Sequence, residues 1–260
     1  MIAYFHPDYP GREFYTIVAL FLRLGYFATR DPAAPFDFAV SWQDATWLAE
    51  DPLLAEIARL KPVVNLACRD ISKTRVEEVF SAVFGRRTLL DPRSHRGRCV
   101  EKHNENARGG RLVTGPIAEP DPRFVYQRLI DSGRDGRMIE YRLPVVFERL
   151  PLVYVQEKAL PEETIKTEKF GLELAEVDSL FSAAEQDGIR AFCRGMGLDF
   201  GELDILRDKG DGEIYILDAN KTPGGFGMLN RMNWRAEQRH AAIEQLAAAF
   251  EAGLQERLSG

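Results

Sequence analysis

The stretch from Gly197 to Gly225 constrains the fold of this chain more than any other. It contains two apolar runs joined by Asp208–Gly212, a run of Asp, Lys and Gly residues that favours a turn. Because both runs are apolar on both faces, the pattern predicts two buried, antiparallel strands. Asp204 nevertheless interrupts the first run, and Asp218 and Asn220 close the second.

The spacing of these polar residues suggests a metal site. If the loop covers residues 209–213, Asp208 pairs with Ile214 and Asp204 lies directly opposite Asp218. Asn220 is two residues from Asp218 and therefore points to the same side of the strand. Facing carboxylates in a buried place repel each other unless a cation lies between them, and oxygen ligands suit Mg²⁺. The alternative is a surface hairpin whose polar residues merely end its strands.

Composition places the chain among ordinary globular proteins of one or two domains. Hydrophobic residues make up 45% of the sequence and charged residues 28%. The net charge is -6 with no strongly basic segment, so we expect no nucleic-acid partner. Three scattered cysteines without metal spacing indicate a reduced, cytoplasmic protein in which they are small buried hydrophobes. No apolar run is long enough for a membrane span, so we expect no membrane partner.

The order of strand and helix patterns predicts three regions. Residues 1–88 alternate short strands and helices, which predicts a small open α/β sheet. Residues 89–170 show hairpin-like spacing typical of a mainly antiparallel sheet. A helix then runs from Val177 to Gly195 before the hairpin, and a long amphipathic helix begins near Asn233. In the first region, four residues near strand ends are either substrate contacts or packing and turn residues: His6, Asp37, Trp42 and Asp44.

Two charged residues in the middle of the chain are candidates for phosphate contacts. Lys102 ends an apolar strand before the Asn- and Gly-rich run Asn104–Gly110, where backbone N–H groups can approach an anion. Arg142 interrupts another apolar run, and arginine fits phosphate oxygens bidentately. The alternatives are a surface lysine and a salt bridge between Arg142 and Glu140 or Glu157.

A further segment, Gln127–Asp131, reads as a strand that leaves one lobe for another. Such a hinge can offer backbone groups to an adenine edge and an acid to a ribose hydroxyl.

The order of these signals along the chain resembles the ATP-grasp family. A lysine on a helix after a strand precedes a lysine before a Gly-rich loop, a Gln-x-Leu-Ile hinge, a Tyr-Arg strand, and Asp and Asp-x-Asn on paired strands. The matching segments are Ile71–Lys73, Val100–Lys102, Val125–Ile130, Ile139–Leu143 and the hairpin. The resemblance extends from about Asn65 to Gly225 and is closest to the amino-acid-ligase branch. That branch typically ends its last strand Glu-Val-Asn-x-x-Pro-Gly, and here the segment is Asp218–Gly224.

This resemblance implies the ATP-grasp fold, which combines an α/β domain with an α+β domain. The α/β domain would cover residues 1–88. The ATP-grasp domain would cover residues 89–260, with lobes of about 89–170 and 171–260 that clasp ATP.

The resemblance also implies residue roles. Lys73 and Lys102 would contact the phosphates or the adenine side of ATP. Gln127, Arg128 and Leu129 would hold the adenine, and Asp131 the ribose. Arg142 would act with Lys102 on the transferring phosphoryl group, and the magnesium ligands would be Asp204, Asp218 and Asn220.

Three positions depart from the family pattern. The loop after Lys102 is richer in Asn and charge than is usual, and Asp218 replaces the more frequent Glu. Glu168, in the run Ile165–Glu168, stands where the ligase branch often has a Thr-Asn pair. These departures bear mainly on the acceptor and on ligation, and less on ATP and Mg²⁺ binding.

The activity implied is that of an ATP- and Mg²⁺-dependent carboxylate–amine ligase working through an acylphosphate. Its substrates would be a small-molecule or peptide carboxylate and an amine, and a homodimer is left open. One alternative is a kinase of the same fold that phosphorylates a small molecule or protein. Another is a nucleotide-binding accessory protein without turnover, although decay would be expected to remove the charged residues first.

Overall fold

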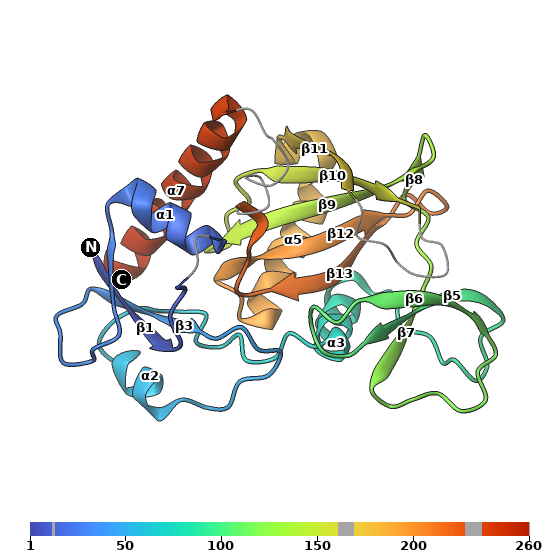
Figure 1. Cartoon of the computed structure of the whole chain (residues 1–260), viewed down its shortest axis with the longest axis horizontal. Coiled ribbons are helices and arrows are strands. Elements are labelled where there is room, and N and C mark those ends of the chain that lie inside the picture. The colour runs from blue at the N-terminus through green and yellow to red at the C-terminus, as the bar shows by residue number, and fades with distance from the viewer. Residues whose placement is uncertain (12–13, 161–168, 227–235, 260) are drawn as a thin grey trace.

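The computed structural model describes residues 1–11, 14–160, 169–226 and 236–259, and their strands form three sheets (Figure 1). The first sheet is parallel, with the strand order β2-β1-β3-β4. Its strands are β1 (Ile2–Pro7), β2 (Phe27–Thr29), β3 (Phe38–Trp42) and β4 (Val63–Val64), and the helices between them are α1 (Thr16–Leu24) and α2 (Pro52–Ile57). This sheet confirms the predicted alternation of strands and helices.

Local signals in the sequence explain where these helices begin and end. Gly25 follows α1 with φ 66°, a left-handed conformation that glycine adopts without a Cβ clash. Asp51 caps α2 by accepting a hydrogen bond from the Leu54 N–H at 3.0 Å, and Pro52 occupies the first turn. The next helix, α3 (Lys73–Phe84), begins after Ser72, whose Oγ accepts from the Arg75 N–H at 3.2 Å.

The second sheet is antiparallel and has the order β6-β5-β7. Its strands are β5 (Gly97–His103), β6 (Gly110–Gly115) and β7 (Phe124–Arg128). Residues 87–90 form no strand, and Leu89 makes an isolated bridge to Gln127.

The third sheet is antiparallel and has the order β11-β10-β9-β12-β13, with β8 paired to β9. Its strands are β8 (Gly133–Arg134), β9 (Arg137–Val146), β10 (Val153–Ala159), β11 (Lys169–Ala175), β12 (Phe200–Arg207) and β13 (Ile214–Asn220). The expected lobe border near residue 170 falls inside β11, so one sheet runs across it. The division of the chain into domains stays a prediction. Glu168 lies outside the described residues.

Three helices accompany this sheet: α4 (Val177–Leu180), α5 (Ala183–Met196) and α7 (Ala236–Ser259). The helix predicted from Val177 to Gly195 is interrupted at Phe181, because Ser182 starts a new helix with a capping box to Glu185. The expected start of the last helix, Asn233, lies outside the described residues. Among the described helices, none is both long and apolar enough to cross a membrane.

The β12–β13 hairpin has the expected central pair but a different turn. Asp204 lies opposite Asp218, as predicted, whereas the turn pairs Arg207 with Ile214 instead of Asp208 with Ile214. A register shift between Asp204 and Ile205 compensates, since Ile205 pairs with Ile216 and one extra residue enters β13.

Two apolar clusters hold the sheets and helices together. The first includes Val76 and Phe80 of α3, Ile189 and Phe192 of α5, and Leu203 of β12, so α3 and α5 pack on one face of the third sheet. The second joins α7 to the first sheet and to α1. The helices α1 and α7 lie side by side in Figure 1. All three cysteines are free and buried, as predicted.

Asn65 connects the first sheet to the hairpin strands. It is fully buried and has a positive φ of 60°. Its Oδ1 accepts from the N–H groups of Asp199 and Phe200, both at 2.9 Å. Its Nδ2 donates to the Phe200 carbonyl at 2.7 Å and more weakly to that of Lys221 at 3.4 Å. One side chain therefore fixes the start of β12 and the residue after β13 against the end of β4.

Replacing Asn65 tests this connection. Asn65→Gly keeps the left-handed backbone but orphans several buried hydrogen-bonding groups, so we expect a loss of about 3 kcal/mol of unfolding free energy. Asn65→Ala should lose about 1 kcal/mol more, because a Cβ disfavours this φ. Urea denaturation measures both values. A loss below about 1 kcal/mol in both variants would contradict the assignment.

Candidate active site

The third sheet carries a row of charged and amide side chains on the face opposite α3 and α5. Arg142 of β9 lies opposite Asp204 of β12, which in turn lies opposite Asp218 of β13. Glu202 lies opposite Asn220 in the same way. Because side chains two residues apart share a face, these five residues point to one side of the sheet.

The acids of this row are paired with cations from different parts of the chain. Arg142 contacts Asp204 at 2.8 Å and Glu202 at 3.1 Å. Lys73, at the start of α3, is buried and lies 2.8 Å from Asp218. The structure therefore brings three predicted site residues, Lys73, Arg142 and Asp218, to the same place as Asp204.

Lys102 and a second ion pair extend the charged region. The electrostatic neighbours of Lys102 include Asp218, Asp204 and Glu140, so its ammonium faces the acids from the three-stranded sheet. Lys158 of β10 forms a close ion pair with Glu140 of β9.

The pKa values follow from burial and from these neighbours. Burial lowers the pKa of Lys102 below 10.5, although the charge of Asp218 opposes this effect. Burial alone would raise the pKa of Asp204, but the positive charges of Arg142 and Lys158 outweigh it, and the pKa lies below 3.8. Burial likewise opposes the charge of Arg142, yet Asp204 and Glu202 hold its pKa above the ordinary value of an arginine. These neighbours thus hold Asp204 and Arg142 charged.

Gln127 and Lys102 lie on the same face of the three-stranded sheet. Gln127 pairs with Val100, two residues before Lys102, so both side chains point to one side. Gln127 is almost completely buried, and its Nε2 donates to Thr88 Oγ1 at 3.3 Å. Among the described residues, its Oε1 has no hydrogen-bond partner.

The other expected adenine and ribose contacts have different surroundings. The Arg128 side chain turns to the β12–β13 turn, where it donates to Asp208 at 2.6 Å and to the Tyr215 hydroxyl at 2.7 Å. Its backbone N–H donates to the Thr88 carbonyl at 2.8 Å. Leu129 is half-buried, and Asp131 is exposed and accepts a hydrogen bond from the Gly133 N–H at 3.0 Å.

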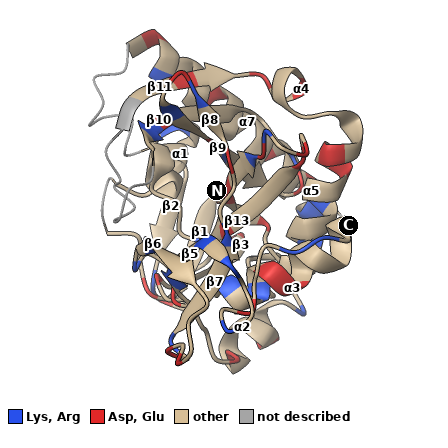
Figure 2. Ribbon diagram, turned by 90° about the vertical axis from the view of Figure 1, so that its right-hand side faces the viewer, with Lys and Arg blue, Asp and Glu red and all other residues tan. Residues whose placement is uncertain are grey.

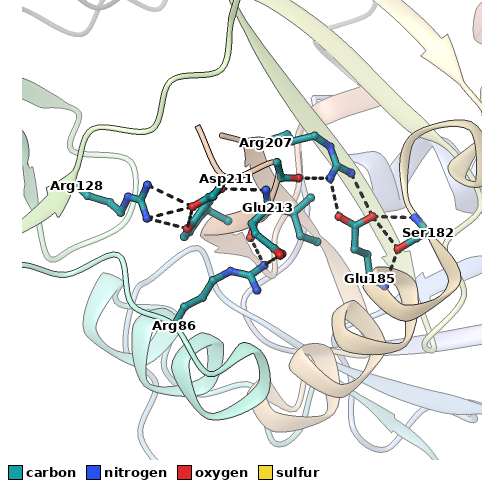
Figure 3. A network of polar contacts seen from close by, with 10 residues as sticks. Arg86, Arg128, Ser182, Glu185, Arg207, Asp211 and Glu213 are labelled. Carbon is teal, nitrogen blue, oxygen red and sulfur yellow. Dashed lines mark hydrogen bonds and ion pairs between the residues drawn. The ribbon is translucent and has the colours of Figure 1, made fainter. Parts of the chain in front are cut away.

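Ion pairs anchor the turn of the hairpin on both sides (Figure 3). Arg128 reaches Asp211 from one side, and Arg86, after α3, contacts Glu213 at 2.9 Å. On the other side Arg207 contacts Glu185 of α5 at 2.7 Å. The hairpin that carries Asp204 and Asp218 is therefore held at its turn by several elements.

The four residues of the first region have different environments. Asp44 accepts from the Thr222 hydroxyl at 3.0 Å, and Thr222 also donates to Asn220, so Asp44 lies close to the row. Trp42 is buried in the second apolar cluster, and His6 contacts Asp51 at 2.9 Å. Asp37 precedes β3, at the opposite end of the parallel sheet, and accepts from the Ile2 N–H.

Sequence reasoning missed Glu202 and Lys158. The alternative that it left open for Arg142 was a salt bridge with Glu140 or Glu157, whereas the ion pairs of Arg142 are with Glu202 and Asp204. Glu140 instead pairs with Lys158, and Glu157 with Arg137. The spacing of two between Glu202 and Asp204 is the signal that would have placed Glu202 on the site face. Glu202 also explains a glycine, since a Cβ on Gly225 would lie 1.9 Å from its Oε2.

The oxygen ligands of the row suit Mg²⁺. No three His, Cys, Asp or Glu side chains gather as a metal site among the described residues. An ion here would therefore be held by two carboxylates and an amide, Asp204, Asp218 and Asn220, together with phosphate oxygens or water. Mg²⁺ usually takes one or two carboxylates and substrate phosphates, so this donor set fits it.

Comparison with known proteins gives matches only at the level of structure. No protein-family model matches the sequence, and no curated protein sequence matches it. The ATP-grasp ligase PsnB, bound to a minimal precursor, Mg and ADP, aligns with a TM-score of 0.60 and 14% identity, covering 97% of this chain and 96% of PsnB. The D-cycloserine synthetase DcsG aligns at 0.57 with 16% identity over 94% and 98% of the two chains.

D-alanine–D-alanine ligase from Bacillus anthracis, bound to ATP, aligns with a TM-score of 0.56 and 13% identity, covering 98% of this chain and 97% of the ligase. The chain therefore has the ATP-grasp fold, with a parallel N-terminal sheet followed by antiparallel sheets. The fold prediction is confirmed, and the structures it matches are those of ligases.

The pKa of Asp204 leads to a test of the site's electrostatics. Because this pKa is lower in the folded protein than in the unfolded chain, Asp204 stabilises the fold fully above about pH 4 and progressively less below it. Without Mg²⁺, the unfolding free energy of the wild type should fall as the pH drops from about 5 to 3. The unfolding free energy of Asp204→Asn should fall less steeply over the same pH range.

Urea denaturation at each pH measures this difference. Asp187→Asn is the matched control, since Asp187 is exposed on α5 and forms an ion pair with its helical neighbour Arg190. An Asp204→Asn profile parallel to that of the wild type would contradict the proposed role of Arg142 in holding Asp204 charged.

Proposed function

We propose that this protein is an ATP- and Mg²⁺-dependent ligase that joins a carboxylate to an amine through an acylphosphate. The proposal is supported by one observation above all. Two carboxylates, Asp204 and Asp218, face each other on paired strands, and three cations from separate elements surround them: Lys73, Lys102 and Arg142. The ligase structures of the same fold add support at the level of the fold.

In the first step a carboxylate oxygen attacks the γ-phosphorus of ATP, and ADP leaves. Such a transfer depends mainly on positioning and on neutralising phosphate charge. Arg142 and Lys102 stabilise the transferring phosphoryl group, and Lys73 binds an adjacent phosphate once its contact with Asp218 loosens. Gln127 presents its Oε1 to the adenine amino group. Asp131 presents its carboxylate to a ribose hydroxyl.

Asp204, Asp218 and Asn220 hold Mg²⁺ in this proposal. The ion, when bound, neutralises phosphate charge and orients the phosphates. Since Arg142 and Lys73 already hold the two carboxylates in place, little rearrangement of the strands is needed for the ion to bind.

In the second step the nitrogen of an amine attacks the acylphosphate carbon, and phosphate leaves as the amide forms and a proton is lost. Proteins of similar fold act on molecules of different size. PsnB is bound to a precursor peptide, whereas DcsG is a D-cycloserine synthetase. The proposed substrates therefore include both small molecules and peptides. We further propose that the protein belongs to the amino-acid-ligase branch of the family.

The substrate requirement of ADP release tests the reaction class. A ligase should release ADP rapidly only when ATP, Mg²⁺, a carboxylate and an amine are all present. A panel of amino acids, short peptides and amines, screened by coupled ADP detection, measures this requirement. A stable phosphorylated product without any amine would favour the kinase, and the absence of ATP binding would contradict both activities.

Asp218→Asn tests the metal assignment with nearly unchanged side-chain shape. We expect kcat/KM to fall about 100-fold or more, because one of two carboxylates for the ion is lost. Asp187→Asn, the same change at an exposed acid of α5 paired with Arg190, serves as the control and should keep its activity. Undiminished turnover of Asp218→Asn would refute the assignment.

A further inference from the structure

A hollow of about 530 Å³ lies beside the row of acids, between two loops that the proposed chemistry has not used. One loop follows β3 and the other follows β5. Its lining includes the side chains of Asp44, Trp47, Glu105, Asn106 and Arg108.

The hollow is connected to the proposed site through its walls. Asn106 accepts a hydrogen bond from Lys73 Nζ at 3.3 Å, and the same ammonium contacts Asp218. On the other wall, Asp44 accepts from the Thr222 hydroxyl, which also donates to Asn220. Two side chains in each direction thus separate a molecule in the hollow from the proposed metal ligands Asp218 and Asn220.

Trp47 gives the hollow an apolar and electron-rich surface. Its side chain is 49% exposed, whereas the other tryptophan of this region, Trp42, is buried. The face of an indole ring attracts organic cations and also covers apolar groups.

The charged groups of the hollow favour a cation. Asp44 is exposed and accepts hydrogen bonds from the neutral hydroxyls of Tyr15 and Thr222, and the ammonium of Lys221 is an electrostatic neighbour of its carboxylate. Arg108 is already paired with Glu105 at 2.9 Å. Two acids against one base leave the lining with a net charge of -1. Lys221, outside the lining, donates to the carbonyl of Ala45.

We propose that this hollow binds the amine substrate as its ammonium ion, with the charge between Asp44 and Glu105 and an apolar group against Trp47. Before its nitrogen attacks, the ammonium gives one proton to one of these carboxylates or to water, and the second proton is lost as the amide forms. The proposal rests on the ligase function, because only the second step requires an amine. It narrows the amine to a primary or secondary amine that carries an apolar or aromatic group and no carboxylate beside the nitrogen.

Direct binding tests this site without relying on turnover. Two probes share a phenyl ring but carry opposite charges: 2-phenylethylamine and 3-phenylpropionate. Ligand-observed NMR titrations of the full chain at pH 7 should give at least about tenfold tighter binding for the amine. Equal affinities, or tighter binding of the acid, would overturn the proposal.

Variants then locate the binding. Trp47→Ala and Glu105→Gln should each weaken binding of 2-phenylethylamine about tenfold, whereas Trp47→Phe should keep most of it. Glu119→Gln makes the same charge change at an exposed acid outside this hollow and should have no effect. Unchanged binding in Trp47→Ala would overturn the proposal. Because Trp47 is exposed, an unchanged melting temperature should accompany each result.

A kinetic experiment separates this proposal from the ligase function. Once an amine that supports ADP release is known, Trp47→Ala should raise its KM and leave the KM of ATP unchanged. Probe binding without any ADP release would leave the hollow in place and refute the ligase function. ADP release with an unchanged amine KM in Trp47→Ala would support the ligase function and refute the amine site in the hollow.

Discussion

The repulsion between Asp204 and Asp218 is the constraint on which the central part of this structure depends. Backbone pairing places the two carboxylates opposite each other, so cations have to come from elsewhere in the chain. Arg142 comes from the next strand, Lys73 from the start of α3, and Lys102 from the three-stranded sheet. Figure 2 shows basic and acidic positions interspersed over the described chain.

This arrangement also explains why the hairpin is fixed at both ends. Asn65 holds its open end against the first sheet, and ion pairs of Arg86, Arg128 and Arg207 hold its turn. Sites that position charges need such support, because a shift of about 1 Å can cost much of the rate. The proposed metal ligands therefore lie on a hairpin that is held both at its open end and at its turn.

The sequence predicted the hairpin because a hairpin depends on local patterns, whereas the fold was implied by the resemblance of the motif order to the ATP-grasp family. Apolar runs, a Gly- and Asp-rich turn, and period-two spacing were sufficient to pair Asp204 with Asp218. The turn itself was predicted one residue off, and the extra residue in β13 corrected the register. Such bulges depend on packing across the sheet, which the sequence of one strand does not reveal.

Partner choice between distant segments was the part that sequence patterns could not resolve. Arg142 has acids nearby in sequence at Glu140 and Glu157, yet it pairs with Glu202 and Asp204 of β12. Likewise, Arg128 looked like an adenine contact, but its side chain stacks on Tyr215 and binds Asp208. These pairings follow from the order of strands in the sheet, which a linear pattern leaves undetermined.

Transfer of oxygen from the carboxylate to phosphate is the most direct test of the proposed reaction. With ¹⁸O in both oxygens of the carboxylate that stimulates ADP release, an acylphosphate route moves one ¹⁸O into each phosphate released. The isotope shift in the ³¹P NMR spectrum of the product measures this transfer. We predict one labelled oxygen per phosphate. Unlabelled phosphate, formed together with ADP, would mean that water attacks ATP and would contradict the ligase mechanism.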